Sequence, residues 1–213
     1  VDELARLARQ HPPLRAHCLT ALASLDESIC HAKLAEMMAD SEPELRYGAF
    51  CGLRRLDERS AEISTMKCKD AFTVHTVAAE SAPLAHYVTS RRTEIVLFGK
   101  TPQLLPELRI TTGDDFTVAS DADGKVTLKR FSLKDRKRGE RQCAPQLIEV
   151  LKALAELGGG YADAVDLLNK AYANHKLSCD LYHDALPLAV EPSQLARLSK
   201  DDPTLRSSSI GGK

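Results

Sequence analysis

Three side chains that can bind zinc are spaced four residues apart toward the C-terminal end of the sequence. His175, Cys179 and His183 would share one face of a continuous helix, and Cys143 would supply a fourth ligand. Against a zinc site, Asn174 and the residues around Cys179 are typical of a loop, and the sequence contains no C-x-x-C pair. We therefore expect no metal and no cofactor, with the zinc site as the alternative.

Three consecutive glycines at residues 158–160 raise the question of a phosphate-binding loop, because glycine amides at a helix N-terminus hold anions. In such a loop the glycines follow a strand and precede a Lys-Ser or Lys-Thr pair. Here they follow a predicted helix, and no such pair comes after them. We expect them to end that helix and to form a sharp turn.

Four further histidines give no indication of catalysis. His17, His31, His75 and His86 are dispersed along the chain, and no Ser or Cys lies in a recognisable nucleophile-elbow motif. We therefore expect that the protein is not an enzyme.

A strongly basic stretch is the clearest candidate for binding. It could bind phosphates with a strong dependence on salt, or an acidic protein partner. Asp135 and Glu140 offset it only in part, and no aromatic residues are interleaved to stack bases. We expect a solvated loop between the last strand and the C-terminal helices, and we do not expect nucleic acid as a partner. Its cations are Lys129, Arg130, Lys134, Arg136, Lys137, Arg138 and Arg141.

The composition is that of an ordinary globular protein. The 213 residues are 43% hydrophobic and 28% charged, with a net charge of −1. No apolar run is long enough to cross a membrane, so we expect no membrane insertion in this segment. The sequence begins at Val1 without a targeting signal, which we interpret as the start of a piece of a longer protein.

The first 62 residues contain an internal repeat. Leu14 and Arg15 recur as Leu45 and Arg46, and further leucines recur at the same offset of 31 residues. Apolar residues within each copy follow the spacing of amphipathic helices. A fixed offset of this size is typical of stacked helical pairs, each of which buries its apolar face against the next.

This region resembles HEAT repeats. Their A-helix pattern is matched by PLRA at residues 13–16 and by PELR at residues 43–46. The resemblance implies a scaffold or binding surface, and further repeats are expected upstream because two copies are few for a stable array.

Beyond residue 70 the pattern changes to that of an α+β domain. Alternating β-branched and aromatic residues predict strands, with hairpin turns at residues 112–115 and 121–125. We expect one small, mostly antiparallel sheet of about five strands over residues 71–132, with a helix at residues 83–90 covering it. The strands are expected at residues 72–76, 94–98, 108–111, 116–119 and 126–131.

The C-terminal part is predicted to be helical. Leucines at helical spacing predict a helix from residue 147, another from Tyr161, and a third at residues 193–198. The fold class is therefore α+β: HEAT-like helical hairpins at residues 1–62, then a domain at residues 70–200 whose sheet is covered by the helices at about 144–200. Residues 201–213 are predicted to be a flexible tail.

Residues 75–197 resemble the C-terminal region of bacterial proteins of the flagellar basal-body P-ring family, in which HEAT-like repeats precede this region. The similarity lies in ESAPL (80–84), SRRTEIVLFG (90–99), DFTV (115–118), RQC (141–143), VLKALAELG (150–158), LSC (177–179) and DALP (184–187). The P-ring is a structural ring around the flagellar rod. The resemblance implies a non-enzymatic assembly module in the periplasm or cell envelope, with flagellar or envelope proteins as partners. The alternative function is a ligand- or nucleic-acid-binding module that uses residues 129–141.

The sequence has six cysteines, at positions 18, 30, 51, 68, 143 and 179. Cys18 and Cys51 lie among apolar helix residues and are expected to be small core fillers. We expect six free thiols. Because the resemblance implies an oxidising periplasm, a disulfide between Cys143 and Cys179, both expected in loops, is the alternative.

Overall fold

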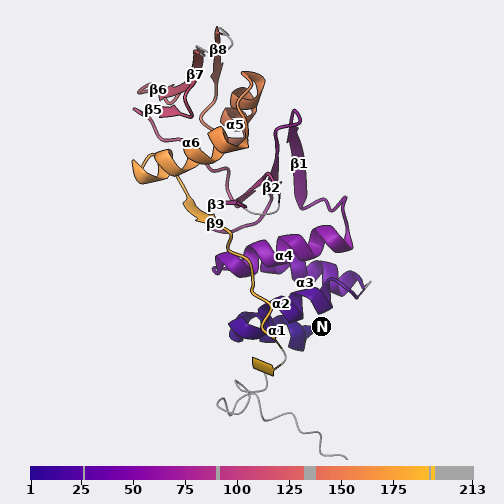
Figure 1. The fold of residues 1–213 in the computed structure, drawn as a ribbon. Coiled ribbons are helices and arrows are strands. Elements are labelled where there is room, and N and C mark those ends of the chain that lie inside the picture. The colour runs from indigo at the N-terminus through magenta and orange to yellow at the C-terminus, as the bar shows by residue number, and fades with distance from the viewer. Residues whose placement is uncertain (26, 90–91, 132–137, 192, 195–213) are drawn as a thin grey trace, which may run out of the picture.

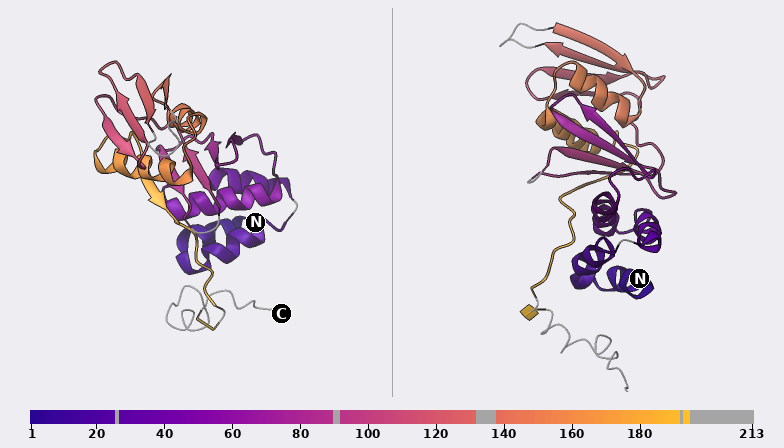
Figure 2. Two further views of the ribbon diagram at one scale, coloured as in Figure 1. Left: turned by 45° about the horizontal axis from the view of Figure 1, so that its top comes forward. Right: turned by 90° about the vertical axis from the view of Figure 1, so that its right-hand side faces the viewer.

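The computed structural model describes residues 1–25, 27–89, 92–131, 138–191 and 193–194. The described elements are stacked in four layers (Figures 1 and 2). A layer of four helices comes first, followed by a five-stranded sheet, two helices and a four-stranded sheet. The model is mixed α and β, as the sequence predicted, but its sheets are arranged differently.

The first 62 residues are helical, as predicted, and contain α1 to α4. Two of them, α2 and α4, begin at prolines 31 residues apart, Pro12 and Pro43, because proline fits the first turn of a helix, where no amide donor is needed. Their membership of the HEAT class stays a prediction. The helices are α1 (Asp2–Gln10), α2 (Pro12–Leu22), α3 (Ser28–Met37) and α4 (Pro43–Leu56).

The repeated arginine has the same structural task in both copies. Arg15 Nε donates to the carbonyl of Ala8 at 3.1 Å, and Arg46 Nε donates to the carbonyl of Met38 at 3.2 Å. Both guanidiniums are buried. Each therefore satisfies a carbonyl at the end of the preceding helix, where no intrahelical donor remains.

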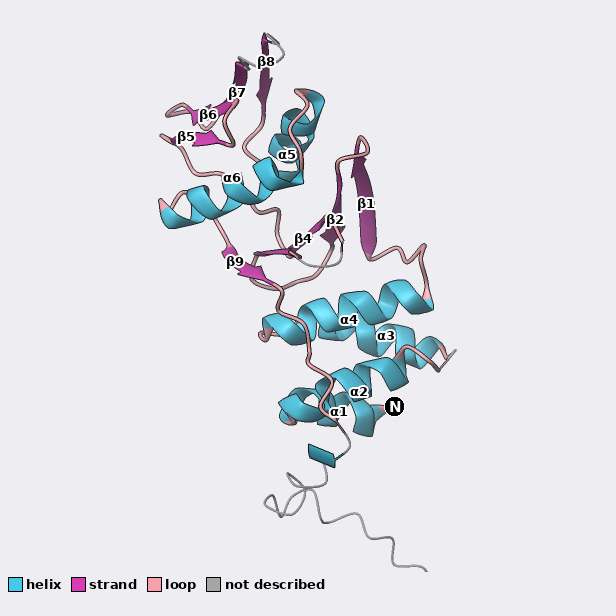
Figure 3. Cartoon of the chain, in the orientation of Figure 1, coloured by secondary structure: helices cyan, strands magenta, loops and turns pink. Residues whose placement is uncertain are grey.

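The first sheet is mixed rather than mostly antiparallel, with strand order β1-β2-β4-β3-β9 and parallel pairs β2–β4 and β3–β9. Figure 3 shows β1, β2, β4 and β9 between the N-terminal helices and α6. The helix predicted at residues 83–90 is wrong, because residues 84–87 pair on both sides, with β4 and with β9. The loop predicted around Cys179 is confirmed at residues 178 and 179, but Asp180 already belongs to β9. The strands are β1 (Ile63–Cys68), β2 (Phe72–Val77), β3 (Leu84–Tyr87), β4 (Glu94–Phe98) and β9 (Asp180–His183).

The second sheet is an antiparallel meander, β5-β6-β7-β8. Both predicted hairpin turns are confirmed, since one joins β5 to β6 and the other joins β6 to β7. The prediction of a single sheet ending at about residue 132 is wrong, because β8 follows and completes this second sheet. Its strands are β5 (Arg109–Thr112), β6 (Phe116–Ser120), β7 (Val126–Phe131) and β8 (Arg138–Cys143).

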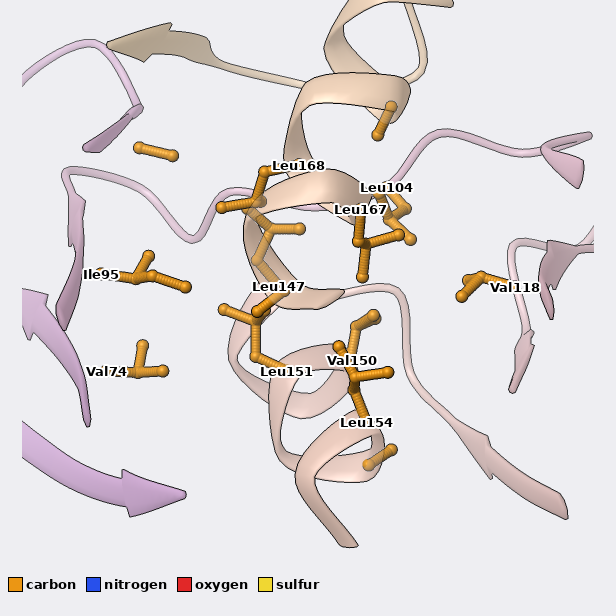
Figure 4. Packing of buried hydrophobic residues seen from close by; sticks show 14 of the residues in the cluster. Val74, Ile95, Leu104, Val118, Leu147, Val150, Leu151, Leu154, Leu167 and Leu168 are labelled. Carbon is orange, nitrogen blue, oxygen red and sulfur yellow. The ribbon is translucent and has the colours of Figure 1, made fainter. Parts of the chain in front are cut away.

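The two C-terminal helices, α5 (Leu147–Glu156) and α6 (Tyr161–Ala173), lie between the sheets. Figure 4 shows their side chains between Val74 and Ile95 of the first sheet and Val118 of the second. These helices therefore cover two sheets rather than one. The buried residues of α5 extend around about half of that helix, which suits contact with both sheets, whereas the buried residues of α6 follow one apolar stripe.

The opposite face of the first sheet packs on the N-terminal helices. Val77, Val96 and Phe98 share a second hydrophobic cluster with Phe50 and Leu53 of α4. The predicted boundary at residue 62 falls just before β1, but the parts on either side of it share this core.

The predicted helix at residues 193–198 is described only at residues 193–194, which are helical, and the predicted tail at 201–213 lies outside the described residues. Among the described helices, none is both long and apolar enough to cross a membrane.

Candidate functional site

The basic stretch forms a β-hairpin, and the predicted loop is wrong for its described residues. Val126 and Leu128 are buried alternate positions of β7, and β8 pairs with β7 along its whole length. This pairing extends the sheet past the point at which the hydrophobic pattern ends. Of the seven predicted contact residues, Lys129, Arg130, Arg138 and Arg141 are on the hairpin, whereas Lys134, Arg136 and Lys137 lie outside the described residues.

Two of the described cations are engaged by the body of the protein. The Arg130 side chain is only 15% exposed, donates to the Leu157 carbonyl at 3.0 Å and lies 3.5 Å from Asp115. Arg141 lies 3.4 Å from Glu156 of α5. Because these groups already have anionic or carbonyl partners, they hold β7 and β8 against α5.

The outer face of the hairpin carries side chains that do not contact α5. Lys129 and Phe131 alternate with Arg130 along β7, so they lie on the face away from α5. Phe131 is 51% exposed, and the Arg138 guanidinium carbon lies 5.0 Å from its ring centroid. Lys129 pairs with Glu140 at 3.4 Å. The stretch therefore does contain an exposed aromatic side chain, which the sequence interpretation overlooked.

The spacing that suggested zinc does not bring its residues together on one helix. Helix α6 ends at Ala173, His175 has a positive φ of 55°, and Cys179 is buried just before β9. His183 ends β9, where it is exposed. The described part of the chain holds no group of three His, Cys, Asp or Glu residues that could hold a metal.

Cys18 is buried in the helical core, as predicted, whereas Cys143 lies in other surroundings than predicted. Cys143 ends β8 rather than lying in a loop, and it and Cys179 pack in or against the same core. Burial raises the pKa of Cys143 to about 11 and that of Cys179 to about 12. All six cysteines are free in the structure. Their oxidation state in the cell stays a prediction.

The glycines at residues 158–160 end helix α5, as predicted. Gly158 has φ of +90°, the conformation of a residue that follows a helix end. The amide of Gly160, at the start of α6, donates to Asp163 at 2.8 Å. A carboxylate of the chain therefore already occupies the position that an anion would take.

Sequence reasoning missed a cluster of ionisable groups between α4 and the first sheet. Glu94 is buried and accepts hydrogen bonds from the Tyr47 hydroxyl at 2.6 Å and from Arg54 at 3.1 Å. His75 Nε2 lies 3.7 Å from the same carboxylate, an ion-pair distance too long for a hydrogen bond. The cluster forms because alternate residues of β2 and β4 face α4.

The surroundings of Glu94 and His86 shift their pKa values. Burial alone would raise the pKa of Glu94, but His75, Tyr47 and Arg54 outweigh it and lower that pKa to about 2. Burial lowers the pKa of His86 to about 4, against the opposing effect of nearby carboxylates. The His86 ring stacks on Tyr47, with 3.9 Å between the centroids.

This cluster is best suited to holding layers together. The Glu94 side chain is 5% exposed, and Arg54 of α4 balances its charge. The backbone carbonyl of Glu94 accepts from the Tyr161 hydroxyl of α6, so the residue links three layers. Glu94 thus has hydrogen-bond partners within the protein in Tyr47 and Arg54, which is the usual state of a buried charge in a structural network.

A groove lies between α2 and α4 in the helical layer. The helices run side by side in parallel, since an added Cβ at Gly48 would lie 2.6 Å from Leu19 and one at Gly52 would lie 3.6 Å from Ala23. The two glycines therefore permit the close approach. The groove has a volume of about 200 Å³ and is lined by Ala16, Leu19, Thr20, Ala23, Gly48, Cys51, Gly52, Arg55, Leu186 and Pro187.

An extended segment of the chain itself closes one end of this groove. After β9 the chain runs down beside the helical layer (Figure 2, right). A Cβ at Gly48 would lie 2.7 Å from Pro187 Cγ, and His17 Nε2 is 2.9 Å from the Val190 carbonyl. Leu188 between them is 80% exposed. The helical surface thus already binds an extended segment of the chain, and this contact was not predicted from the sequence.

No family model, curated protein or solved structure shows a significant similarity to this chain.

Proposed function

We propose that this chain is a non-enzymatic protein-interaction module that serves assembly and binds partners on the helical repeat surface. The observation that carries the proposal is the extended segment on α2 and α4, with Pro187 against Gly48. A surface that packs against an extended segment of its own chain has the shape and chemistry to pack against one from another protein. The commitment of Glu94 and its neighbours to internal pairs also favours a structural role.

The cellular setting that we propose is the bacterial envelope, as a periplasmic module associated with the flagellar P-ring. This part of the proposal rests on the sequence resemblance described above. A repeat surface suits such a role, since stacked repeats create an extended binding surface.

Affinity capture from detergent-solubilised host membranes tests this function. We expect the full-length protein to retain flagellar or other envelope proteins. Thr20→Glu, which places a charge on the exposed rim of the groove, should lose them. Ser24→Glu, one turn away and outside the groove lining, should retain them. Equal capture by both variants would contradict a role for the groove, and capture of cytosolic proteins alone would contradict the envelope setting.

A second candidate function is binding of an anionic ligand or nucleic acid by the β7–β8 hairpin. The observation that favours it is the exposed Phe131 beside Arg138 and Lys129, since a base can stack on an aromatic ring while cations neutralise phosphates. We expect a Phe131→Ala, Arg138→Ala variant to lose heparin or single-stranded DNA binding, and the wild-type affinity to fall steeply with salt. Retention on heparin that is unchanged in this variant would exclude the hairpin.

A further inference from the structure

The groove between α2 and α4 has two chemically different ends. At one end Leu186 and Pro187 pack over Gly48, so this end already accepts apolar side chains on an extended backbone. At the other end Arg55, an exposed residue in the last turn of α4, contributes to the lining. The floor between them is made of small or apolar side chains, including Ala23 and Gly52.

We propose that this groove binds an extended partner segment that has an apolar Leu-Pro anchor and a carboxylate. The anchor would pack over the glycine floor, and the carboxylate would pair with Arg55. This inference rests on the proposed function and names the chemistry of its partner. The occupant is argued from continuity with the Leu186–Pro187 contact and from the charge of Arg55.

The chain's own segment is then a competitor for the apolar end of the groove. Beyond Pro187 its contacts are few: Leu188 is 80% exposed, and the hydrogen bond between His17 and Val190 lies at the surface. A tethered segment nevertheless acts at an effective concentration in about the millimolar range, so it would weaken binding of a free peptide. Displacing the segment should therefore expose the full groove.

A labelled peptide with the sequence ALPLAVE, which is residues 185–191, provides the probe. It is titrated against the full chain and against a Leu186→Asp, Pro187→Ser full-chain variant, with fluorescence anisotropy as the readout. We expect the variant to bind roughly tenfold more tightly than the wild type, because its own segment no longer competes. If circular dichroism shows that the double variant is misfolded, the single variant Pro187→Ser replaces it in the titration.

Matched variants in that background test the two ends of the groove. Thr20→Glu should abolish peptide binding, whereas Ser24→Glu should leave it unchanged. In the chain's own segment the residues after Pro187 run toward His17, away from Arg55, so the carboxylate is tested with a second peptide that carries Glu at the other end, EALPLAV. Arg55→Glu should weaken binding of this peptide, and Lys in place of its Glu should restore it. Arg59→Glu, another exposed position outside the groove lining, is the control for charge.

The contrary outcomes are distinct. A scrambled peptide that binds equally well, or no difference between the position-20 and position-24 variants, would overturn the proposal. Equal binding by the Arg55→Glu and Arg59→Glu variants would overturn the carboxylate assignment. If the peptide fails to bind while Thr20→Glu still loses captured envelope proteins, this inference falls and the proposed function stands.

Discussion

At the scale of residues, buried arginines connect the elements of the helical layer to one another and to the first sheet. The buried Arg15 and Arg46 recur in the repeat because each supplies donors at the end of the preceding helix. Arg46 also donates to the Ala82 carbonyl at 3.0 Å and to the Ser81 hydroxyl at 2.8 Å, which ties the helical layer to the first sheet. The sequence repeat therefore reflects the need to supply hydrogen-bond donors to helix-end carbonyls, as well as apolar packing.

Replacing Arg46 should be costly. Arg46→Met keeps much of the side-chain volume but leaves buried carbonyls without a donor, so we expect a loss of about 2–3 kcal/mol in the free energy of unfolding. Urea denaturation measures it. The exposed control, Arg59→Met, should change stability by less than about 0.5 kcal/mol. An equal effect of the two substitutions would show that Arg46 is not buried in this way.

The buried His86 should make stability depend on pH. Its pKa is lowered to about 4 in the folded protein, whereas an unfolded chain has a His pKa of about 6.5. The unfolded state therefore binds more protons between these values. Stability is full above about pH 6.5 and falls by about 2–3 kcal/mol as the pH drops toward 4.

Unfolding free energies measured across that range test the assignment to His86. His86→Gln should flatten the dependence, because glutamine can still accept from the Ala185 amide but does not titrate. The exposed His183→Gln should retain the pH dependence.

The lowered pKa of Glu94 makes stability depend on pH in a lower pH range. The stability that Glu94 contributes is present above about pH 4.3 and is lost as the pH falls toward 2.

The thiols give a further residue-scale prediction. Burial raises the pKa of Cys51, Cys68 and Cys143 to about 11, so these thiols should react slowly with Ellman's reagent at pH 8 in the folded protein. After denaturation without reductant, we expect six free thiols. A count of four, with Cys143 and Cys179 linked in a peptide map, would establish the disulfide instead.

At the scale of elements, the sequence predicted best where one strand face is apolar and the other polar. The strands β5, β6 and β7 alternate in this way, and their positions are confirmed. Strand β3 reads Leu-Ala-His-Tyr and lacks alternation because it is buried on both faces. Strand β8 is an edge strand of charged and polar residues, so its structure depends on the neighbouring β7 rather than on its own composition.

The β7–β8 hairpin separates structural from exposed cations. Arg130→Met should lower the free energy of unfolding by about 1.5–3 kcal/mol, since it removes the donor to Leu157 and the ion pair with Asp115. Lys129→Met, the neighbouring residue with an exposed surface ion pair, should change stability by less than about 0.5 kcal/mol. Chemical denaturation of both variants decides this, and the reverse order would contradict the inward orientation of Arg130.

At the scale of the whole molecule, the layers share their cores, and this arrangement creates the candidate site. The groove depends on how closely α2 approaches α4 and on where the chain runs after β9. The sequence feature that could have indicated the groove is the pair Gly48 and Gly52, four residues apart in a predicted helix. The position of residues 184–191 depends on the pairing of β9 with β3, which local sequence does not encode. For this reason the repeat was predictable and the groove was not.

Photo-crosslinking in the native host tests the central claim, that a partner protein occupies the groove. A photoreactive phenylalanine analogue replaces Thr20 on the groove rim in the full-length protein, and the same analogue at Ser24 is the control. We predict an adduct with another protein from position 20 that is absent from position 24 and diminished by Arg55→Glu. Identical adducts from both positions, or none from position 20, would contradict the account.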